Sequence, residues 1–434
     1  MNAFEKIIGY EAIKKELAQI SDVLANKEAY ERLGVSSPRG LLLHGDPGVG
    51  KTLMASAVIK ASGRKAFTCR KNSPNGDFVK KIKKTFKDAA EAAPSIVLLD
   101  DMDKFANGDD RHPDAEEYVT VQSCIDEIKG KEVFVLATAN SLRALPRSLK
   151  RAGRFDRVIE VNNPRGEDAV KIIEHYIKGK KFVGDMDAVT VARIMDGRSC
   201  EELETVINEA GLYAGFERSE EITMDHFMRA CLHTIHDVPN EVLCESSFDT
   251  DLSNGDDPRT RVVYHEAGHA TIAEVLNPGS VTLISAYCRD GESGGFTSYY
   301  RSGFSGSAER QQSHILGSLG GMAALEQKFG IIDTGASGDL DQAFRSTWNL
   351  VTENCLCGFH LHSNSFDDSG DLKAKQEQMA AAEIERFYRK VKEILSKNRE
   401  LFEAIAGELS IKGVLTAADI RRIKENCGCI PVAV

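Results

Sequence analysis

Two histidines and a glutamate are spaced so that together they could bind a metal ion and use it. They belong to the segment His265-Glu-Ala-Gly-His269, which matches the pattern H-E-x-x-H. Residues four apart lie on one face of a helix, so both imidazoles can reach a single Zn²⁺ ion. Glu266 then lies beside the open coordination position, where a carboxylate can take a proton from water and pass it to a leaving amine. The segment predicts a zinc centre for hydrolysis; the alternative is a surface helix that carries two histidines by chance.

A zinc site of this kind needs a third protein ligand, and the sequence leaves its identity open. The candidates are acidic residues downstream of the two histidines: Glu326, Asp333, Asp339 and Asp341. Residues 335–339 open a helical pattern, and an acid at the start of that helix would be well placed beside the first helix. Spacing alone does not separate Asp339 from Asp341.

A glycine-rich segment could bind the phosphates of a nucleotide. Residues 45–52 match the pattern G-x-x-x-x-G-K-[ST], follow an apolar stretch and open a helical one. The glycines let backbone N–H groups turn toward phosphate oxygens, and the following helix adds its positive N-terminal end. Lys51 is expected to reach the β- and γ-phosphates, and Thr52 to ligate Mg²⁺. We therefore predict a site for ATP or ADP with Mg²⁺ made by Gly45, Asp46, Pro47, Gly48, Val49, Gly50, Lys51 and Thr52.

Three polar residues follow two further apolar stretches and would complete an ATPase site. Asp100 and Asp101 follow residues 95–99, and Asn140 follows residues 133–137. The first carboxylate is expected to hold Mg²⁺, directly or through water, and the second to polarise the attacking water. Asn140 could help to position that water. Because Asp101 is one methylene shorter than the more usual glutamate, slow hydrolysis is compatible with this site.

Two arginines, Arg151 and Arg154, stand close together before the last apolar strand of this region. On a nucleotide-binding domain such arginines could reach into the site of a neighbouring subunit and stabilise the transferring phosphate. The alternative is a pair of ordinary surface arginines, and composition does not decide between the two.

Alternating strands and helices must position the nucleotide residues. Apolar strands are predicted at 40–44, 66–69, 95–99, 133–137 and 158–161. Helical patterns separate them, which is typical of an α/β domain with a mostly parallel sheet. After Pro164 the pattern is helical only.

A second set of elements must position the metal residues. Residues 239–258 are rich in polar and turn-forming residues and are predicted to form a linker. A new helix is predicted from Asp257-Pro258 to Asn277-Pro278, and the rest is mainly helical apart from a β-like stretch at 280–300. The predicted domains are an α/β nucleotide-binding domain (1–163), a small helical domain (164–238), the linker (239–258) and a mainly α-helical domain that carries the metal motif (259–434).

Composition limits the classes of function that fit. At 434 residues the chain has room for about three domains. Its 55 basic and 66 acidic residues give a net charge of −11, which argues against a general nucleic-acid binder. No apolar run approaches the ~20 residues that span a bilayer, and the N-terminus lacks the pattern of a signal peptide. The ten scattered cysteines fit a reducing compartment. We expect a soluble cytoplasmic protein.

Together these motifs resemble the AAA+ zinc metalloproteases of the FtsH type. The resemblance runs from Phe4 to about Lys424 and rests on Gly45–Thr52, Leu98–Asp101, Ala137–Asn140, Arg151–Arg157, His265–His269 and Thr334–Ala343. It implies an AAA+ P-loop domain with a helical lid, then a helical zinc peptidase. It also implies a homo-oligomer, a hexamer in this family, that hydrolyses ATP to unfold, translocate and cleave unfolded or tagged polypeptides, with no nucleic-acid partner.

The resemblance also implies roles for individual residues. Asp339 matches the third zinc ligand, and Arg151 and Arg154 match the arginines that act in a neighbouring subunit. Ile8 and Gly9 belong to a segment similar to the one that packs near the adenine, and His175 matches a histidine near the nucleoside. Residues 294–297 resemble the edge strand that would pair with extended substrate.

Three departures from the family pattern bear on the expected function. Family members usually carry N-terminal membrane helices, whereas this chain starts where the ATPase begins, so we expect a soluble member or a truncated form. Residues 74–76 lack the aromatic of the family's pore loop, and Phe78 is the nearest substitute. Asp101 replaces a glutamate. These departures keep two alternatives open: a nucleotide-organised peptidase ring with weak ATPase, and an ATP-dependent remodeller with a vestigial peptidase.

Overall fold

The chain divides into two compact units, Met1–Phe227 and Met228–Val434. The computed structural model describes residues 3–71, 77–105, 115–146, 148–149, 153–184, 187–243, 248, 250–287, 294–300, 307–362 and 370–432. Each unit has its own hydrophobic core, and each is described by itself.

The first unit is built on a parallel sheet in the order β2-β3-β4-β1-β5. Its strands are β1 (Gly40–His44), β2 (Lys65–Cys69), β3 (Ser95–Leu99), β4 (Val133–Ala139) and β5 (Arg157–Glu160). These are the five strands that the sequence predicts, with small shifts at their ends. Because all neighbouring strands in this sheet are parallel, the segments that follow β1, β3 and β4 meet at the carboxyl end of the sheet.

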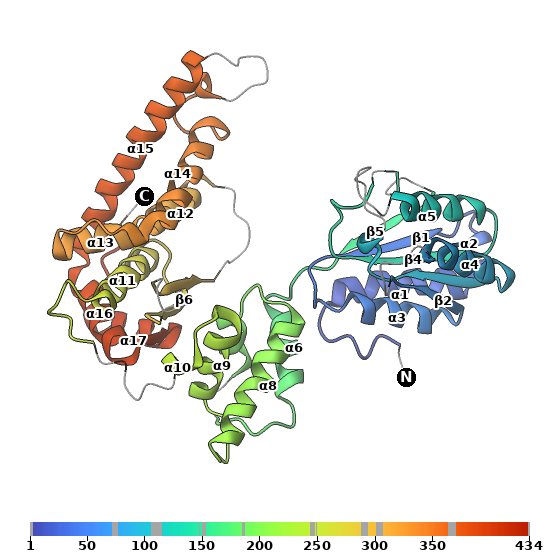
Figure 1. Ribbon diagram of the computed structural model, residues 1–434, viewed down its shortest axis with the longest axis horizontal. Coiled ribbons are helices and arrows are strands. Elements are labelled where there is room, and N and C mark those ends of the chain that lie inside the picture. The colour runs from blue at the N-terminus through green and yellow to red at the C-terminus, as the bar shows by residue number, and fades with distance from the viewer. Residues whose placement is uncertain are drawn as a thin grey trace. The chain divides into compact units, whose positions relative to one another are not determined.

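Helices cover this sheet. α1 (Glu11–Ala25) packs on α3 (Lys51–Ser62), and α4 (Phe78–Glu91) packs on α5 (Ala115–Glu127), β2 and β3. Figure 1 shows α1 and α3 together below the strands and α5 above them. The short α2 (Lys27–Glu31) and a 3₁₀ turn, η1 (Met102–Lys104), complete this part.

Phe78 belongs to the core of the first unit. Its side chain is only 6% exposed, and its ring makes an edge contact with Phe105 at a centroid distance of 5.0 Å. The expectation that Phe78 replaces the pore-loop aromatic is therefore wrong, because a ring packed in the core cannot grip a passing chain. Residues 74–76, which that expectation also concerns, lie outside the described residues.

The first unit continues with helices only. They are α6 (Glu167–Ile177), α7 (Ala188–Ile194), α8 (Cys200–Phe216) and α9 (Met224–His236), the last of which runs on into the second unit. A capping box sets the start of α8, since Ser199 and Glu202 each accept a hydrogen bond from the other's backbone N–H. Glu201 N–H donates to the carbonyl of Gly48 at 3.2 Å. The first turn of α8 thus sits on the glycine-rich loop.

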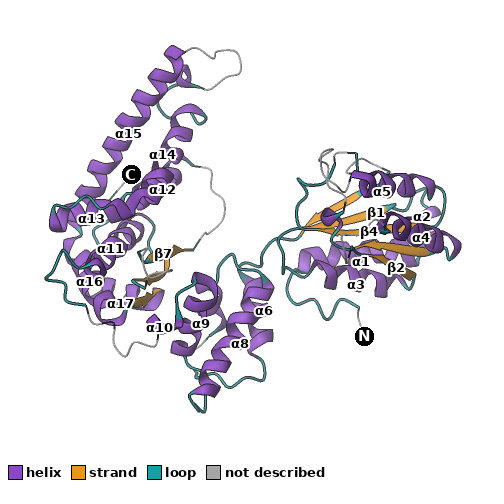
Figure 2. Cartoon of the chain, viewed as in Figure 1, coloured by secondary structure: helices purple, strands orange, loops and turns teal. Residues whose placement is uncertain are grey.

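The second unit is mainly helical, as Figure 2 shows. Its elements are α10 (Asn240–Leu243), α11 (Pro258–Leu276), β6 (Val281–Ser285), β7 (Phe296–Tyr299), α12 (Ala308–Ser318), α13 (Gly320–Phe329), η2 (Thr334–Ala336), α14 (Ser337–Thr352), η3 (Phe359–Leu361), α15 (Gly370–Lys397), α16 (Arg399–Lys412), β8 (Val414–Thr416) and α17 (Ala417–Cys427). α11 is central, packing against α12, α13, α15, α16 and β6. Every residue from Glu266 to Val275 is buried, as expected for a helix with neighbours on several sides.

A small antiparallel sheet in the order β7-β6-β8 lies against α11. The β-like stretch at 280–300 thus contains two strands, and β7 is at the edge of the sheet. β8, a strand of three residues, is too short to be predicted from the periodicity of the sequence. A buried ion pair fastens this region: Glu274, 2% exposed, accepts from the N–H groups of Gly279 and Val281 and from Lys424 Nζ at 2.6 Å.

Among the described residues, the helices that are long enough to cross a bilayer are too polar to do so.

Candidate active site

α11 brings His265 and His269 together. Asp257 caps the helix by accepting from the N–H of Thr260 at 3.1 Å, and Pro258 occupies its first turn. The helix begins and ends where the sequence predicts. The two Nε2 atoms are 3.0 Å apart, so the spacing of four residues does place both imidazoles on one face.

Asp339, in the first turn of α14, completes the cluster. Its Oδ2 lies 3.1 Å from His265 Nε2 and 3.2 Å from His269 Nε2. In the part of the chain that the structure describes, these three residues are the one set of acids, histidines or cysteines close enough to share a metal ion, with ligand atoms within 4.8 Å of one another.

The other three acidic candidates lie elsewhere. Asp341 is exposed on α14. Asp333 accepts a hydrogen bond from the N–H of Gly335 and so caps the 3₁₀ turn η2. Glu326 accepts from Lys392 Nζ and from the Tyr388 hydroxyl. The structure therefore separates Asp339 from the alternatives that spacing left open.

The cluster fits a zinc ion by its donors and by its charge. Two imidazole nitrogens and one carboxylate oxygen are typical of a catalytic zinc site, which keeps a fourth position open. His269 Nδ1 lies 2.7 Å from the carbonyl of Gly317, which turns Nε2 toward the cluster. Burial alone would lower the pKa of His269, but the hydrogen bond to Asp339 and the charge of Glu266 raise it to about 9. The cluster thus attracts positive charge.

Glu266 is held beside this cluster by a strand. Its side chain is 4% exposed, and Oε2 accepts a hydrogen bond from the Thr297 hydroxyl of β7 at 2.7 Å. Burial raises the pKa of the Glu266 carboxyl, a property that suits a group exchanging protons near neutral pH. The strand is predicted from the sequence but the contribution of Thr297 is not, because the H-E-x-x-H motif carries no sign of what faces its glutamate.

Two close approaches between α11 and α13 require glycine. A Cβ on Gly321 would lie 2.4 Å from the His265 ring, and a Cβ on Gly268 would lie 2.5 Å from the carbonyl oxygen of Gly320. Real Cβ atoms do not come this close to other heavy atoms. The sequence gives no signal for these glycines, because it does not show which helix each of them faces.

The glycine-rich segment forms a loop between β1 and α3. A Cβ on Gly45 would lie 1.9 Å from the carbonyl oxygen of Val161, and Gly50 caps α3 with φ +92°. Lys51 is buried, and its Nζ donates to the carbonyls of Gly45 and Asp46 at 2.8 Å each. The predicted strand, loop and helix are in place, with the positive end of α3 at the loop.

The acids that follow β3 meet this loop. Asp100 is buried, and its Oδ1 accepts from the hydroxyls of Thr52 at 3.2 Å and Thr138 at 2.8 Å. The Thr138 hydroxyl also accepts from the N–H of Asp101 at 2.9 Å. Asn140, half-buried, comes directly after β4. The structure brings these residues together at the carboxyl end of the sheet. The sequence motifs assign no role to Thr138, which links Asp100 to the backbone of Asp101.

The N-terminal segment and α6 hold the remaining nucleotide candidates. Gly9 has φ +68°, and the N–H of Tyr10 donates to Asp168 Oδ1 at 2.7 Å, so Ile8 and Gly9 lie against the start of α6. His175 is exposed on α6 and makes an edge contact with the Tyr176 ring. Across the described residues, no hydrogen bond or ring contact joins His175 to residues 45–52.

Arg154 is engaged within its own chain. It forms two hydrogen bonds with the carboxylate of Asp126 on α5, at 2.8 and 3.3 Å, and a third with the carbonyl of Ser148. Action in a neighbouring subunit would require these bonds to open. Arg151 lies outside the described residues.

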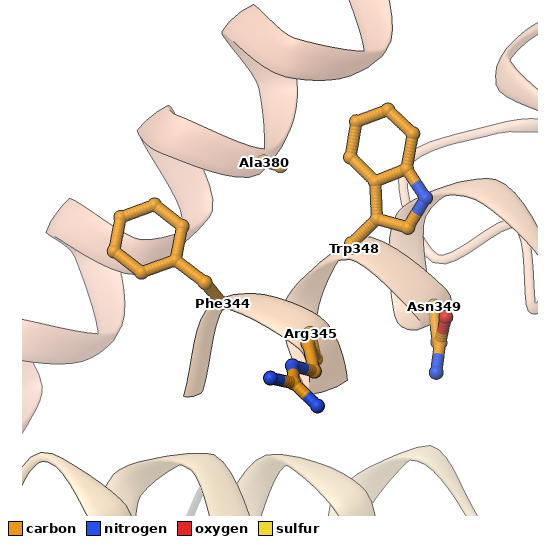
Figure 3. Close-up of a pocket in the computed structure, with 5 residues that line it drawn as sticks. All are labelled: Phe344, Arg345, Trp348, Asn349 and Ala380. Carbon is orange, nitrogen blue, oxygen red and sulfur yellow. The ribbon is translucent and has the colours of Figure 1, made fainter. Parts of the chain in front are cut away.

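A surface groove lies between α14 and α15 in the second unit (Figure 3). Its lining residues are Phe344, Arg345, Trp348, Asn349 and Ala380. None of these five is an acid, histidine or cysteine, the residues that bind zinc, so the candidate metal site remains the cluster on α11 and α14.

Comparisons with known proteins match one family to each half of the chain. Residues 41–163 match the ATPase family associated with various cellular activities (AAA), and residues 254–423 match peptidase family M41. The ATP-dependent zinc metalloprotease FtsH 2 of Symbiobacterium thermophilum is 30% identical over 97% of this chain and 74% of its own length. FtsH of Helicobacter pylori strain J99 is 30% identical over 97% of the chain and 70% of its length. FtsH of Mesoplasma florum is 29% identical over 98% of this chain and 67% of its own length. On this evidence the chain belongs to the FtsH family of ATP-dependent zinc metalloproteases.

Proposed function

We propose that this chain unfolds polypeptides with ATP, draws them through a ring of identical subunits and cleaves them at the α11 cluster. The observation that carries the proposal is the convergence of His265, His269 and Asp339 beside Glu266. Membership of the family supports ATP-dependent proteolysis. The hexamer, the translocation step and the residue roles below are proposals.

In the peptidase site each residue has a distinct task. His265, His269 and Asp339 would hold Zn²⁺, which when bound would act as a Lewis acid toward the scissile carbonyl and the attacking water. Glu266 takes the proton from the attacking water and passes it to the leaving amine. The side of β7 that is not paired in the described sheet offers N–H and C=O groups to an extended substrate, which would align the scissile bond.

In the nucleotide site residues 45–52 would hold the phosphates, with Thr52 and Asp100 on Mg²⁺. Asp101 and Asn140 would orient the attacking water, and Ile8, Gly9 and His175 would lie near the base and sugar. Arg151 and Arg154 of one subunit would act on the nucleotide of the next. The described cysteines form no disulfide bonds with one another, which supports a reducing compartment such as the cytoplasm.

Two variants test this function. Glu266→Gln keeps the size of the side chain but removes the base, so casein cleavage should fall at least about 100-fold, while zinc content and ATP turnover are retained. Lys51→Ala should abolish ATP turnover and the degradation of folded substrates but leave zinc content unchanged. Unaltered casein cleavage by Glu266→Gln, or unaltered degradation by Lys51→Ala, would contradict the proposal.

A second candidate is a peptidase ring that nucleotide organises but hydrolyses slowly. It is favoured by the environment of Asp101, whose carboxylate is paired with two basic side chains of its own chain. Steady-state ATP turnover distinguishes the two candidates, because strong stimulation by an unfolded substrate argues for translocation.

A further inference from the structure

The last residue of α9 contacts β7, and the peptidase mechanism proposed above gives this contact no role. The imidazole of His236 lies flat on the ring of Phe296, with ring centroids 3.9 Å apart and an angle of 13° between the ring planes. His236 is 5% exposed, and both residues belong to the second unit. A buried side chain from a distant part of the sequence therefore supports the strand that carries Thr297.

The turn that ends α9 fixes the position of His236. Asp237 has φ +53°, in the left-handed region, and the chain reverses there. The N–H of Val238, which is fully buried, then donates to the carbonyl of Leu232 at 3.1 Å. His233 Nδ1 lies 3.0 Å from the carbonyl oxygen of Val238. Because a carbonyl can only accept, this nitrogen carries the proton and braces the turn.

β7 carries the effect of this contact from one of its faces to the other. Successive side chains of a strand point to opposite faces, so Phe296 and Thr297 face opposite ways. The Thr297 hydroxyl lies 2.7 Å from Oε2 of Glu266 and 3.3 Å from the Glu266 carbonyl oxygen. His236 thus supports one face of β7, and the carboxylate proposed as the base lies at the other.

The pairing of β7 with β6 does not by itself fix the strand. β7 has four residues and lies at the edge of its sheet, and the pairing is interrupted by a register shift between Val281 and Leu283. The backbone before Phe296 has no spare room, because a Cβ on Gly295 would lie 2.0 Å from the Ser285 carbonyl oxygen. A shift of Phe296 is therefore passed on to Thr297.

We propose that His236 is a positioning residue of the peptidase site, which holds β7 through Phe296 and thereby keeps Thr297 in reach of the Glu266 carboxylate. The inference rests on the proposed role of Glu266 as the base. Ring pairs stabilise their arrangement beyond the area that they bury, and a hydrogen bond weakens when it lengthens or bends. Loss of the stack should misalign Glu266 and leave the three metal ligands in place.

Leucine substitutions on either side of the stack test the effect on cleavage. His236→Leu and Phe296→Leu should each lower kcat for casein cleavage about two- to tenfold, the range expected for losing one ring pair. KM, zinc content and ATP turnover should not change. His360→Leu, which alters an exposed histidine of η3 in the same unit, is the control and should leave kcat unchanged.

Variants that keep a flat ring separate positioning from general packing. His236→Phe and Phe296→Tyr retain the stack, so they should keep most of the activity that the leucine variants lose. Helicity and the unfolding temperature of each variant are recorded. Phe296 is only half-buried, so Phe296→Leu tests the same contact even if His236→Leu does not fold.

Double variants test the route from the stack to the base. If His236 acts through Thr297, adding His236→Leu to Thr297→Val should lower kcat no further than Thr297→Val does alone. Adding His236→Leu to Phe296→Leu should likewise have no additional effect. Damage that is merely structural would instead multiply the two losses.

The outcomes separate this inference from the function on which it rests. Unaltered casein cleavage by Glu266→Gln would mean that the proposed base is wrong. If Glu266→Gln is inactive while Phe296→Leu retains full activity, the positioning role is overturned. Multiplying losses in the double variants overturn it too, as does a loss in both flat-ring variants equal to that in the leucine variants.

Discussion

At the scale of single residues, the two candidate sites depend on hydroxyl groups outside the motifs. Thr297 donates to the carboxylate of Glu266, and Thr138 links Asp100 to the backbone of Asp101. Each hydroxyl comes from a strand next to the element that carries the acid. A hydrogen bond to a charged group stabilises one orientation of that group and sets the geometry in which it exchanges protons.

Replacing Thr297 by valine tests this dependence in the peptidase site. Thr297→Val keeps the shape of the side chain but removes the donor, so kcat for casein cleavage should fall about 10- to 100-fold, as expected for losing a hydrogen bond to a charged group. Zinc content should not change. Thr297→Ser, which restores the hydroxyl, should recover most of the loss. Equal activity of the valine and serine variants would show that the hydrogen bond has no catalytic role.

At the scale of elements, the metal cluster depends on how closely α11 and α13 approach. Gly268 and Gly320 let the two backbones touch, and Gly321 leaves room for the imidazole of His265. The start of α14 then brings Asp339 to the same place. The three side chains of the cluster come from two helices, and a third helix lies behind the imidazole of His265.

Adding a methyl group to Gly321 tests whether that space positions His265. In Gly321→Ala the Cβ would meet the His265 ring, so the ring must move and zinc affinity should fall at least about tenfold. Gly407→Ala on α16 is the control, because its Cβ would meet open space. Zinc is titrated with a competing chelator, and helicity is recorded to show that both variants fold. Unchanged zinc affinity in Gly321→Ala would mean that the helices adjust without moving the ligand.

At the scale of the whole molecule, the residues of each candidate site belong to a single unit. The glycine-rich loop and its acids lie in Met1–Phe227, and the metal cluster lies in Met228–Val434. The two units have separate hydrophobic cores. A ligand that binds only the folded form of one unit should therefore stabilise that unit alone.

Calorimetric unfolding tests this independence. Mg²⁺ and ADP at about 100 times Kd should stabilise one transition by about 2.7 kcal/mol, and a zinc chelator should lower only the other. Lys51→Ala should remove the shift caused by Mg²⁺ and ADP and leave the shift caused by the chelator. His269→Ala should do the reverse. A single transition that responds to both ligands in both variants would show that the units unfold together.

The sequence by itself determined the local parts of this protein. The five strands of the first unit, the start and end of α11 and the placement of residues 45–52 between a strand and a helix follow from periodicity, capping and glycine content, which act over a few residues. Helical spacing likewise determined that His265 and His269 share a face. Local rules sufficed because each of these features is stabilised by neighbours in the chain.

Only the tertiary structure decided which distant side chains meet. It placed Asp339 rather than Asp341 in the cluster, because helix packing and not spacing sets which carboxylate faces the imidazoles. It buried Phe78, paired β8 with β6 and brought His236 to Phe296. These outcomes depend on contacts between segments far apart in the sequence or on the side to which a turn directs a side chain. Such contacts leave no periodic signal, so only the packed fold selects them.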